Sequence, residues 1–236
     1  MRKMKGSGSY LKNQVRKNLA KAVLCLALVC LILFAVASYA LLTLRLNVFE
    51  AALLLVSLVP LGAFFYYLRK YRVYNGGWVG EKQVTKLLSS RLSDDYTLLN
   101  GLYLRDGGGD IDHVVLGPSG VFVLETKNWS GDVTCHGDEW QRAGKRGFKG
   151  SPSLQVKRNA AKIKRIIDSS PKLPRIWVEG ILVFTNNHAT LHLSNPTVPI
   201  LKLSQLPNYI TTQQSQDGYT QQQLEEVAKE ILKHKD

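Results

Sequence analysis

Cysteine is scarce in this sequence: three cysteines occur among 236 residues, and no two of them form a CxxC pair. Cys25 and Cys30 lie within an uncharged stretch, and Cys135 stands alone. This pattern excludes a disulfide framework and a cysteine-based zinc site, and it fits a reducing compartment. We expect Cys135 to be a small buried hydrophobic residue. Internal repeats are absent too, and the length predicts one ordinary domain with appendages.

Acidic residues are missing from the first part of the chain. The formal net charge is +13, and the basic excess is most concentrated in residues 1–21, ahead of the first apolar run. Seven basic residues and no acidic residue lie there: Arg2, Lys3, Lys5, Lys12, Arg16, Lys17 and Lys21. Basic flanks are typical of the cytoplasmic side of a membrane helix. We therefore predict that residues 1–21 form a basic cytoplasmic segment.

Charge of either sign is absent from two long apolar stretches, residues 22–44 and 51–68. A helix needs about 20 apolar residues to cross a bilayer, so both stretches are close to or above the required length. Only residues 45–50 separate them, which predicts a transmembrane helical hairpin in the cell inner membrane, with the lipid bilayer as a partner. The alternative, two buried helices of a soluble domain, needs uncharged runs that are unusual in soluble proteins.

Basic residues flank the hairpin unequally. Arg69, Lys70 and Arg72 follow the second stretch, whereas Arg45 is the only basic residue between the two stretches. Cytoplasmic flanks carry the basic excess, so both chain termini should be cytoplasmic. A cleaved signal peptide is the competing interpretation, but the first stretch exceeds a signal core of about 7–15 residues and a second stretch follows it.

The chemistry of the globular part is concentrated in residues 107–128, GGGDIDHVVLGPSGVFVLETKN. Two apolar strands meet there at a Gly-Pro-Ser-Gly turn, and they carry Asp110, Asp112, Glu125 and Lys127. An unpaired charge in a buried strand is costly or becomes neutral. These four side chains should therefore be paired with one another or bind a metal.

The turn predicts which of these side chains meet. If the two residues between the glycines form the loop, antiparallel pairing places Asp112 opposite Glu125. The same register places Asp110 opposite Lys127. Two carboxylates at this spacing repel each other, and a divalent cation between them would turn the repulsion into a binding site. Proline at the first loop position suits turns other than those of tight hairpins, and a bulge would shift one strand by a residue.

The rest of the globular part reads as alternating helices and strands. We predict a linker over residues 69–77, of which residues 69–75 continue the second apolar helix or connect it to the domain. Gly76 and Gly77 should break the helix, and a new helix should cover residues 78–92. Glu81 lies on the inward face of this helix, as a first-turn acid favoured by the helix dipole or as a site residue. Strands are predicted over residues 96–104, 132–136, 176–185 and 198–203, with helices over residues 204–210 and 220–235. Because both faces of the central hairpin are apolar, helices should cover both sides of its sheet.

A basic run lies between residues 142 and 165, with nine Lys or Arg and no acidic residue. A Ser-Pro pair at residues 151–152 predicts a helix start, and the helix places Gln155 and Asn159 one above the other. A basic run is usually a solvated face, but beside a candidate metal site it favours phosphate binding. The residues assigned to nucleic-acid binding are Arg142, Lys145, Arg146, Lys149, Lys157 and Arg158.

Several of these motifs together resemble the nuclease-related domain (NERD) family. They are Gly80-Glu81 at a helix start, Ile111-Asp112-His113 on a strand, the run from Gly120 to Asn128 followed by Gly131, Gln155 with Asn159, and Ser204-Gln205-Leu206. The resemblance covers residues 78–210. The family is similar to PD-(D/E)XK nucleases, so it implies an α/β fold, with a restriction-endonuclease-like mixed sheet flanked by helices.

The resemblance also implies roles for individual residues. Asp112 and Glu125 match metal ligands, for Mg²⁺ or Mn²⁺, and Lys127 matches the lysine that positions or activates water. Glu81 matches the acid of the first helix, and Gln155 matches a later helical polar residue. These five residues are the predicted catalytic set. The interval between the matching Asp and Glu is short, and no proline precedes the Asp, which departs from the family pattern.

Three hypotheses remain open. The first is a membrane-anchored, Mg²⁺-dependent nuclease that hydrolyses phosphodiester bonds, with DNA favoured over RNA. The second is a nucleic-acid-binding or scaffold protein that keeps the fold without turnover. The third, a mere buried ion pair with Lys127, leaves Glu81 and the basic run unexplained. The predicted order of parts is residues 1–21, the hairpin 22–68, the linker 69–77, the nuclease-like domain 78–210, and a polar linker with an amphipathic helix over 211–236.

Overall fold

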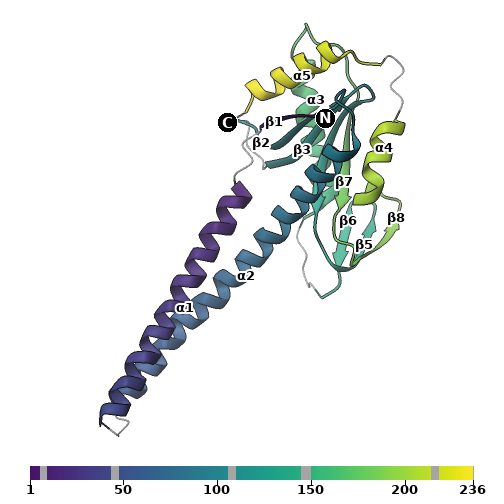
Figure 1. Ribbon diagram of the computed structural model, residues 1–236. Helices are drawn as coiled ribbons and strands as arrows, with labels where there is room; N and C mark the ends of the chain where they lie inside the picture. The colour runs from purple at the N-terminus through teal and green to yellow at the C-terminus, as the bar shows by residue number, and fades with distance from the viewer. Residues whose placement is uncertain (6–9, 44–47, 106–109, 145–149, 214–217, 236) are drawn as a thin grey trace. The chain divides into compact units, whose positions relative to one another are not determined.

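The computed structural model describes residues 1–5, 10–43, 48–105, 110–144, 150–213 and 218–235 (Figure 1). The chain divides into two compact units. One unit is Tyr10–Trp78, and the other combines Met1–Ser9 with Val79–Asp236. We refer to them as the helical unit and the α/β unit.

The helical unit consists of α1 (Tyr10–Thr43) and the first part of α2 (Val48–Arg91). Both helices are long and apolar enough to cross a membrane. Only 17% and 11% of their most apolar windows are buried, unlike the core helices of a soluble domain. Four of the buried residues of α1 recur every seven positions, at Val15, Ala22, Val29 and Val36, which is the spacing of a narrow packing seam.

The predicted helix break at Gly76 and Gly77 is wrong, because α2 runs through both glycines to Arg91. A glycine inside a helix costs about 1 kcal/mol relative to alanine. Helix formation is cooperative, so the helical residues on both sides outweigh that cost. Residues 69–77 are therefore helical, and one helix carries both the second apolar stretch and Glu81.

The α/β unit is built on a six-stranded sheet with the order β1-β2-β3-β4-β7-β9. Its strands are β1 (Arg2–Lys5), β2 (Thr97–Tyr103), β3 (Asp110–Gly117), β4 (Gly120–Lys127), β7 (Val178–Phe184) and β9 (Ile200–Lys202). Strands β2, β3 and β4 are antiparallel, whereas β1, β7 and β9 each join in parallel. The sheet is therefore mixed, as predicted.

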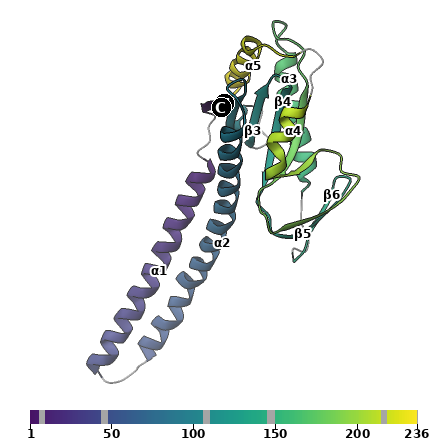
Figure 2. The same ribbon diagram turned by 45° about the vertical axis from the view of Figure 1, so that its right-hand side comes forward.

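A smaller sheet of three strands has the order β6-β5-β8. Its strands are β5 (Gly131–His136), β6 (Glu139–Arg142) and β8 (Ala189–Ser194). Figure 2 shows this sheet at the end of the α/β unit away from α5. Its inner face packs Val133, Cys135 and Trp140 into the main core, so Cys135 is the buried hydrophobic residue that the sequence predicts.

Helices cover both faces of the large sheet, which confirms the predicted α/β class. On one face, α3 (Pro152–Asp168) and α5 (Gln221–Lys233) share a core with the sheet. On the other face, the end of α2 and α4 (Leu206–Thr212) form a second core. A short 3₁₀ helix, η1 (Leu203–Gln205), precedes α4. Ser151 caps α3 by accepting a hydrogen bond from the backbone N–H of Leu154, as the Ser-Pro pair predicts.

The central hairpin has the predicted two-residue loop, with Gly117 paired to Gly120 and the ladder continuing to His113 opposite Leu124. A Cβ at Gly117 would lie 2.2 Å from the ring of Tyr96, so no larger residue fits there. Gly120 has φ of 131°, a conformation that favours glycine. The two glycines therefore fix the register that the site depends on.

Strand β1 was not predicted, since residues 1–21 were expected to be only a basic cytoplasmic segment. Arg2–Lys5 pair in parallel with β2, in a register that joins Arg2 to Thr97. Arg2 also forms an ion pair with Glu225 of α5. A four-residue edge strand rich in Lys and Arg has no local sequence signal, because its stability comes from a partner distant in sequence. The start of the chain therefore belongs to the α/β unit.

Candidate functional site

The candidate site lies where β3 begins and β4 ends, so residues from the two central strands meet at one end of the sheet. Asp112 Oδ2 accepts a hydrogen bond from the backbone N–H of Thr126, with a nitrogen–oxygen distance of 2.7 Å. Burial and the charges of Glu125 and Glu81 raise the pKa of Asp112 well above its usual range. The structure therefore brings these three acids into one electrostatic cluster.

Glu125 is the most buried of these acids, with 3% of its side chain exposed. Lys127 Nζ donates to Glu125 Oε1 at 2.6 Å and to Gln155 Oε1 at 3.3 Å. Gln155 comes from α3, so this contact joins the helix to the strand. Burial raises the pKa of Glu125, while the charge of Lys127 opposes that shift. The carboxylate, the lysine and the amide form one connected group.

The second oxygen of Glu125, Oε2, is buried and has no hydrogen-bond partner in the part of the chain that the structure describes. A buried oxygen without a partner is costly, and a bound cation is one group that would satisfy it. Among the described residues, no three His, Cys, Asp or Glu side chains are grouped to hold a metal ion. Mg²⁺ needs fewer, because it keeps several waters and binds one or two carboxylates. The pair of Asp112 and Glu125 fits that requirement.

Glu81 reaches the site from α2. Burial and the charges of Asp110 and Glu125 raise the pKa of Glu81 to about 7. The preceding residue explains how the helix comes so close, because a Cβ at Gly80 would lie 2.8 Å from Thr185 Oγ1. Only glycine allows α2 to approach the ends of β4 and β7 in this way. Because α2 begins at Val48, Glu81 is far from the helix start, and its interpretation as a first-turn acid is wrong. The site explains its inward orientation.

His113, next to Asp112, connects the strands of the site to α2 through hydrogen bonds. Its Nδ1 lies 2.7 Å from Asn100 Oδ1 on β2, and Thr85 of α2 donates to the same oxygen at 3.3 Å. Burial lowers the pKa of His113 to about 3, so the ring is neutral at physiological pH. The contact links β3, β2 and the helix that carries Glu81.

The predicted position of Asp110 opposite Lys127 is not found. In the described ladders, β3 pairs with β4 only as far as His113, so the predicted pair of Asp112 and Glu125 is not in the ladder either. On its other side, β3 pairs Asp110 with Tyr103 of β2. Asp110 nevertheless contributes to the acidic field at Glu81. The sequence placed it beside the lysine, and the structure places it beside the acids.

The predicted nucleic-acid-binding residues fall into three groups. Lys145, Arg146 and Lys149 lie outside the described residues. Lys157 is paired with Asp138 at 2.7 Å, so its charge is already compensated. Arg158 is exposed, and its charge lowers the pKa of Glu125, which brings it within electrostatic reach of the site.

Arg142, the remaining member of the predicted set, lies beside Trp129. Its guanidinium carbon is 5.5 Å from the centre of the Trp129 ring. Lys127 Nζ lies 5.8 Å from the same ring. Trp129 was not predicted as a site residue, and the signal that points to it is its position two residues after Lys127.

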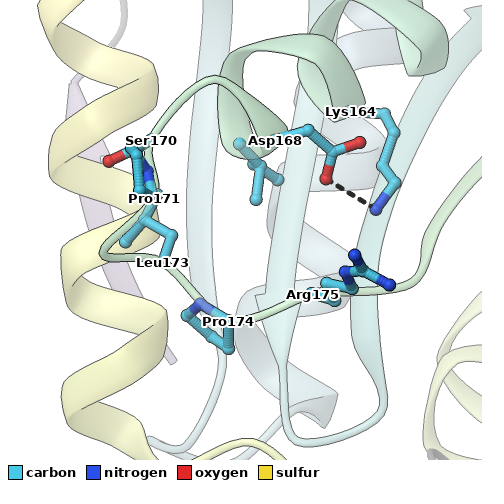
Figure 3. A pocket seen from close by; sticks show the side chains of 8 residues that line it. Lys164, Asp168, Ser170, Pro171, Leu173, Pro174 and Arg175 are labelled. Atoms are coloured by element: carbon cyan, nitrogen blue, oxygen red, sulfur yellow. Dashed lines mark hydrogen bonds and ion pairs between the residues drawn. The ribbon is translucent and has the colours of Figure 1, made fainter.

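A pocket of about 530 Å³ lies at the other end of α3, lined by Lys164, Asp168 and the loop from Ser170 to Arg175. Figure 3 shows Lys164 directed at Asp168, and their ion pair measures 2.9 Å. Gln155 lies thirteen residues before Asp168 on this helix, which corresponds to a rise of about 20 Å. The pocket therefore contains none of the predicted site residues.

Comparison with known proteins agrees with the resemblance found in the sequence. Residues 76–185 match the family model described as nuclease-related domain. A stretch of 87 residues is 30% identical to a protein of Streptomyces coelicolor described as probable kinase PglW, and covers 36% of this chain and 6% of that protein. An uncharacterized protein of Bacillus anthracis is 37% identical over 87 residues, which are 36% of this chain and 39% of that protein. No solved structure matches the chain.

Proposed function

Because residues 76–185 match the family model described as nuclease-related domain, we propose that the protein is a metal-dependent nuclease that hydrolyses phosphodiester bonds in DNA. The observation that carries the proposal is the state of Glu125. One of its oxygens is bonded to Lys127 and the other is buried without a partner, and Asp112 lies beside it. A buried pair of carboxylates with an adjacent lysine has the parts that phosphodiester hydrolysis requires.

Asp112 and Glu125 would hold Mg²⁺ or Mn²⁺. When bound, such an ion supplies Lewis acidity and lowers the pKa of a coordinated water. Lys127 places a positive charge at the same position, where it stabilises the negative charge that develops on the phosphoryl group. Gln155 holds Lys127 in place by accepting one of its hydrogen bonds.

Glu81 has a different part in the proposal. With a pKa of about 7, its carboxyl group can hold or release a proton at neutral pH. Burial among acids is the cause of this shift, and a bound cation would reverse it by favouring the charged form. Glu81 therefore completes the acidic cluster from the helix side, facing the strand that carries Glu125.

The basic residues support DNA as the substrate. Arg158 is exposed on α3, three residues after Gln155, and so lies one helical turn from the contact with Lys127. Lys and Arg that neutralise backbone phosphates supply much of the affinity of proteins for nucleic acid. The formal charge of +13 is consistent with such a polyanionic partner.

A cleavage assay tests the proposed function. The full-length protein in detergent micelles should nick or degrade plasmid DNA in Mg²⁺ or Mn²⁺ and leave it intact in EDTA. The full chain is needed because a fragment without the apolar helices would also lack β1, which precedes them and pairs with β2. The Glu125→Ala variant should be inactive. Binding of DNA with steep salt dependence, without cleavage in any metal, would instead identify a nucleic-acid-binding or scaffold protein.

We also propose that the two apolar helices anchor the α/β unit at the cytoplasmic face of the inner membrane. The pairing of β1 with β2 supports this topology, because β1 precedes both helices and β2 follows them. Strands of one sheet must lie on the same side of a membrane. Two membrane crossings return the chain to the side where it began, so that β1 and β2 can pair. The basic residues that flank the two helices favour the cytoplasmic side.

Reporter fusions test this topology. A cytoplasmic reporter fused after Asp236 should be active, and the same reporter fused after Phe49, between the two apolar stretches, should be inactive. An exported reporter such as alkaline phosphatase should give the opposite pattern at the two sites. Exported activity after Asp236 would contradict the proposed orientation.

A further inference from the structure

A groove of about 580 Å³ runs along the exposed side of α1 in the helical unit. Its lining residues recur at spacings of three and four, so they lie on one face of the helix. At about 100° per residue, this face is turned away from the packing seam that begins at Val15. All of the lining side chains are exposed: Arg16, Leu19, Ala20, Val23, Leu24 and Ala27.

In the proposed topology, the groove extends from the membrane surface into the membrane. Arg16 lies six residues before Ala22, where the first apolar stretch begins, and this separation is about 9 Å along the helix. The headgroup layer on each side of a bilayer is about 5–8 Å thick, and a long arginine side chain reaches into it. Ala27, at the other end, lies within the apolar stretch. The charged end of the groove is therefore level with the headgroups, and its apolar part is level with the acyl chains.

The charge at this end of the groove is complementary to an anionic headgroup. Residues 1–49 contain no Asp or Glu, so no acid of α1 neutralises Arg16. Lys12 lies one turn before Arg16 on the same side of the helix. Lys21 is directed at α2 instead, because its amine lies 5.1 Å from the centre of the Tyr67 ring. Arg16 is therefore the cation that borders the apolar part of the groove.

We propose that this groove binds one anionic phospholipid, with the phosphate at Lys12 and Arg16 and an acyl chain along Ala20 and Ala27. The inference rests on the proposed membrane anchoring and is independent of nuclease activity. Clusters of Lys and Arg at the cytoplasmic end of a membrane helix are typical of proteins that bind anionic lipids. Two alanines among larger apolar side chains leave room for a chain of methylene groups.

Two other accounts of the same features are less complete. Basic residues before a membrane helix also determine topology, but that effect depends on their number and gives no role to one face of the helix. A helix from a second copy of the chain is the other candidate occupant. Two copies inserted in the same orientation would bring their Arg16 side chains to the same depth, where like charges repel. An anionic lipid meets attraction at that depth.

Native mass spectrometry of the full-length protein tests the proposal, in detergent micelles with equal amounts of phosphatidylglycerol and phosphatidylcholine that carry the same acyl chains. The wild type should retain one phosphatidylglycerol in preference to phosphatidylcholine. Arg16→Gln should lower this preference by about 5-fold, which is the effect of one basic residue near an anionic lipid surface.

The matched control is Lys17→Gln. It removes the same charge one residue later, at an exposed position that does not line the groove. Its preference for phosphatidylglycerol should stay within about 2-fold of the wild type. Equal losses in Arg16→Gln and Lys17→Gln would overturn the proposal, because they would show a general attraction between basic residues and anionic lipid.

A second pair of variants tests the apolar part of the groove without a change of charge. Ala20→Leu fills the groove next to Arg16 and should reduce the retained phosphatidylglycerol by about 5-fold or more. The control is Ala35→Leu, because Ala35 is also exposed on α1 and lies outside the groove. This control should retain the lipid like the wild type. Full retention by Ala20→Leu would overturn the proposed acyl-chain position.

The outcomes also separate this inference from the proposed anchoring. A protein that alkaline carbonate washes from cell membranes is not anchored by its helices, and that result would overturn both proposals. A protein that stays in the membrane but retains the two lipids equally would overturn the inference alone. A wild-type dimer without lipid preference, which Ala20→Leu converts to a monomer, would assign the groove to a second copy of the chain.

Discussion

Replacing Lys127 with alanine should slow DNA cleavage by about 10²–10³-fold, the loss typical when one charge-stabilising group is removed from an active site. The expected size follows from the position of its amine, 2.6 Å from Glu125 Oε1 and 3.3 Å from Gln155 Oε1. Its positive charge lies beside the Glu125 carboxylate. Among the described residues, no other lysine contacts Glu125 or Gln155. The measurement is the rate of plasmid nicking in Mg²⁺.

The control for this variant is Lys164→Ala. Lys164 is also paired, with Asp168 at 2.9 Å and with the carbonyl of Ile176 at 3.1 Å, but it lies at the far end of α3. We expect cleavage by this variant within about 2-fold of the wild type, because surface ion pairs contribute little. If Lys127→Ala kept more than a tenth of the wild-type rate, the role assigned to Lys127 would be wrong.

Without a divalent cation, the α/β unit should become less stable as the pH rises from about 4.5 to 7. Glu81 has its usual pKa near 4.5 in the unfolded chain and about 7 in the folded protein. The folded state therefore binds more protons across this window, and each rise in pH favours unfolding. The contribution of Glu81 to this loss should approach about 3 kcal/mol. The raised pKa values of Asp112 and Glu125 add to the loss in the same direction. Thermal unfolding in EDTA, followed by tryptophan fluorescence across this pH range, measures it.

Two variants show whether the cause is the acidic cluster. Glu81→Gln should reduce the pH dependence and raise the melting temperature at pH 8, because the amide carries no charge. Mg²⁺ at 100 times its Kd should stabilise the wild type at pH 8 by about 2.7 kcal/mol. This gain should vanish in Glu125→Gln.

The matched control is Glu179→Gln. Burial also raises the pKa of Glu179, but this acid hydrogen-bonds to Tyr209 of α4 and belongs to no part of the site. Its replacement should leave the Mg²⁺ effect unchanged. Equal stabilisation of Glu125→Gln by Mg²⁺ would place the metal somewhere else.

The parts of the fold that the sequence predicted are those with local causes. Alternating apolar residues and a pair of glycines indicate the β3–β4 hairpin, and a Ser-Pro pair indicates the start of α3. The hairpin register depends on two glycines, and it brings Asp112 and Glu125 onto neighbouring strands just beyond the last pair, His113 and Leu124. These features need no information from distant parts of the chain.

The features that the sequence did not predict depend mainly on residues that are far apart in the chain. Strand β1 depends on β2, about 90 residues away, and four charged or flexible residues give no sign of that partner. The predicted position of Asp110 was wrong because the β3–β4 ladder ends at His113 and Leu124, and the turn residues give no sign of that end. Lys157 was predicted to bind DNA, but in the folded chain its charge is compensated by an ion pair with Asp138, which is distant in sequence. The helix break at Gly76 and Gly77 failed because local propensity was outweighed by cooperative helix formation.

The position of β1 has a consequence for how the protein is made. At about 5–20 residues per second, the ribosome needs roughly 5–20 s after β1 to deliver the residues of β2 that pair with it. In the proposed topology, both apolar helices enter the bilayer during that interval, and β1 has no strand partner until they have done so. Its Lys and Arg side chains would then keep it on the side of the ribosome, because charged residues cross a membrane poorly. This order of synthesis would make completion of the sheet depend on membrane insertion.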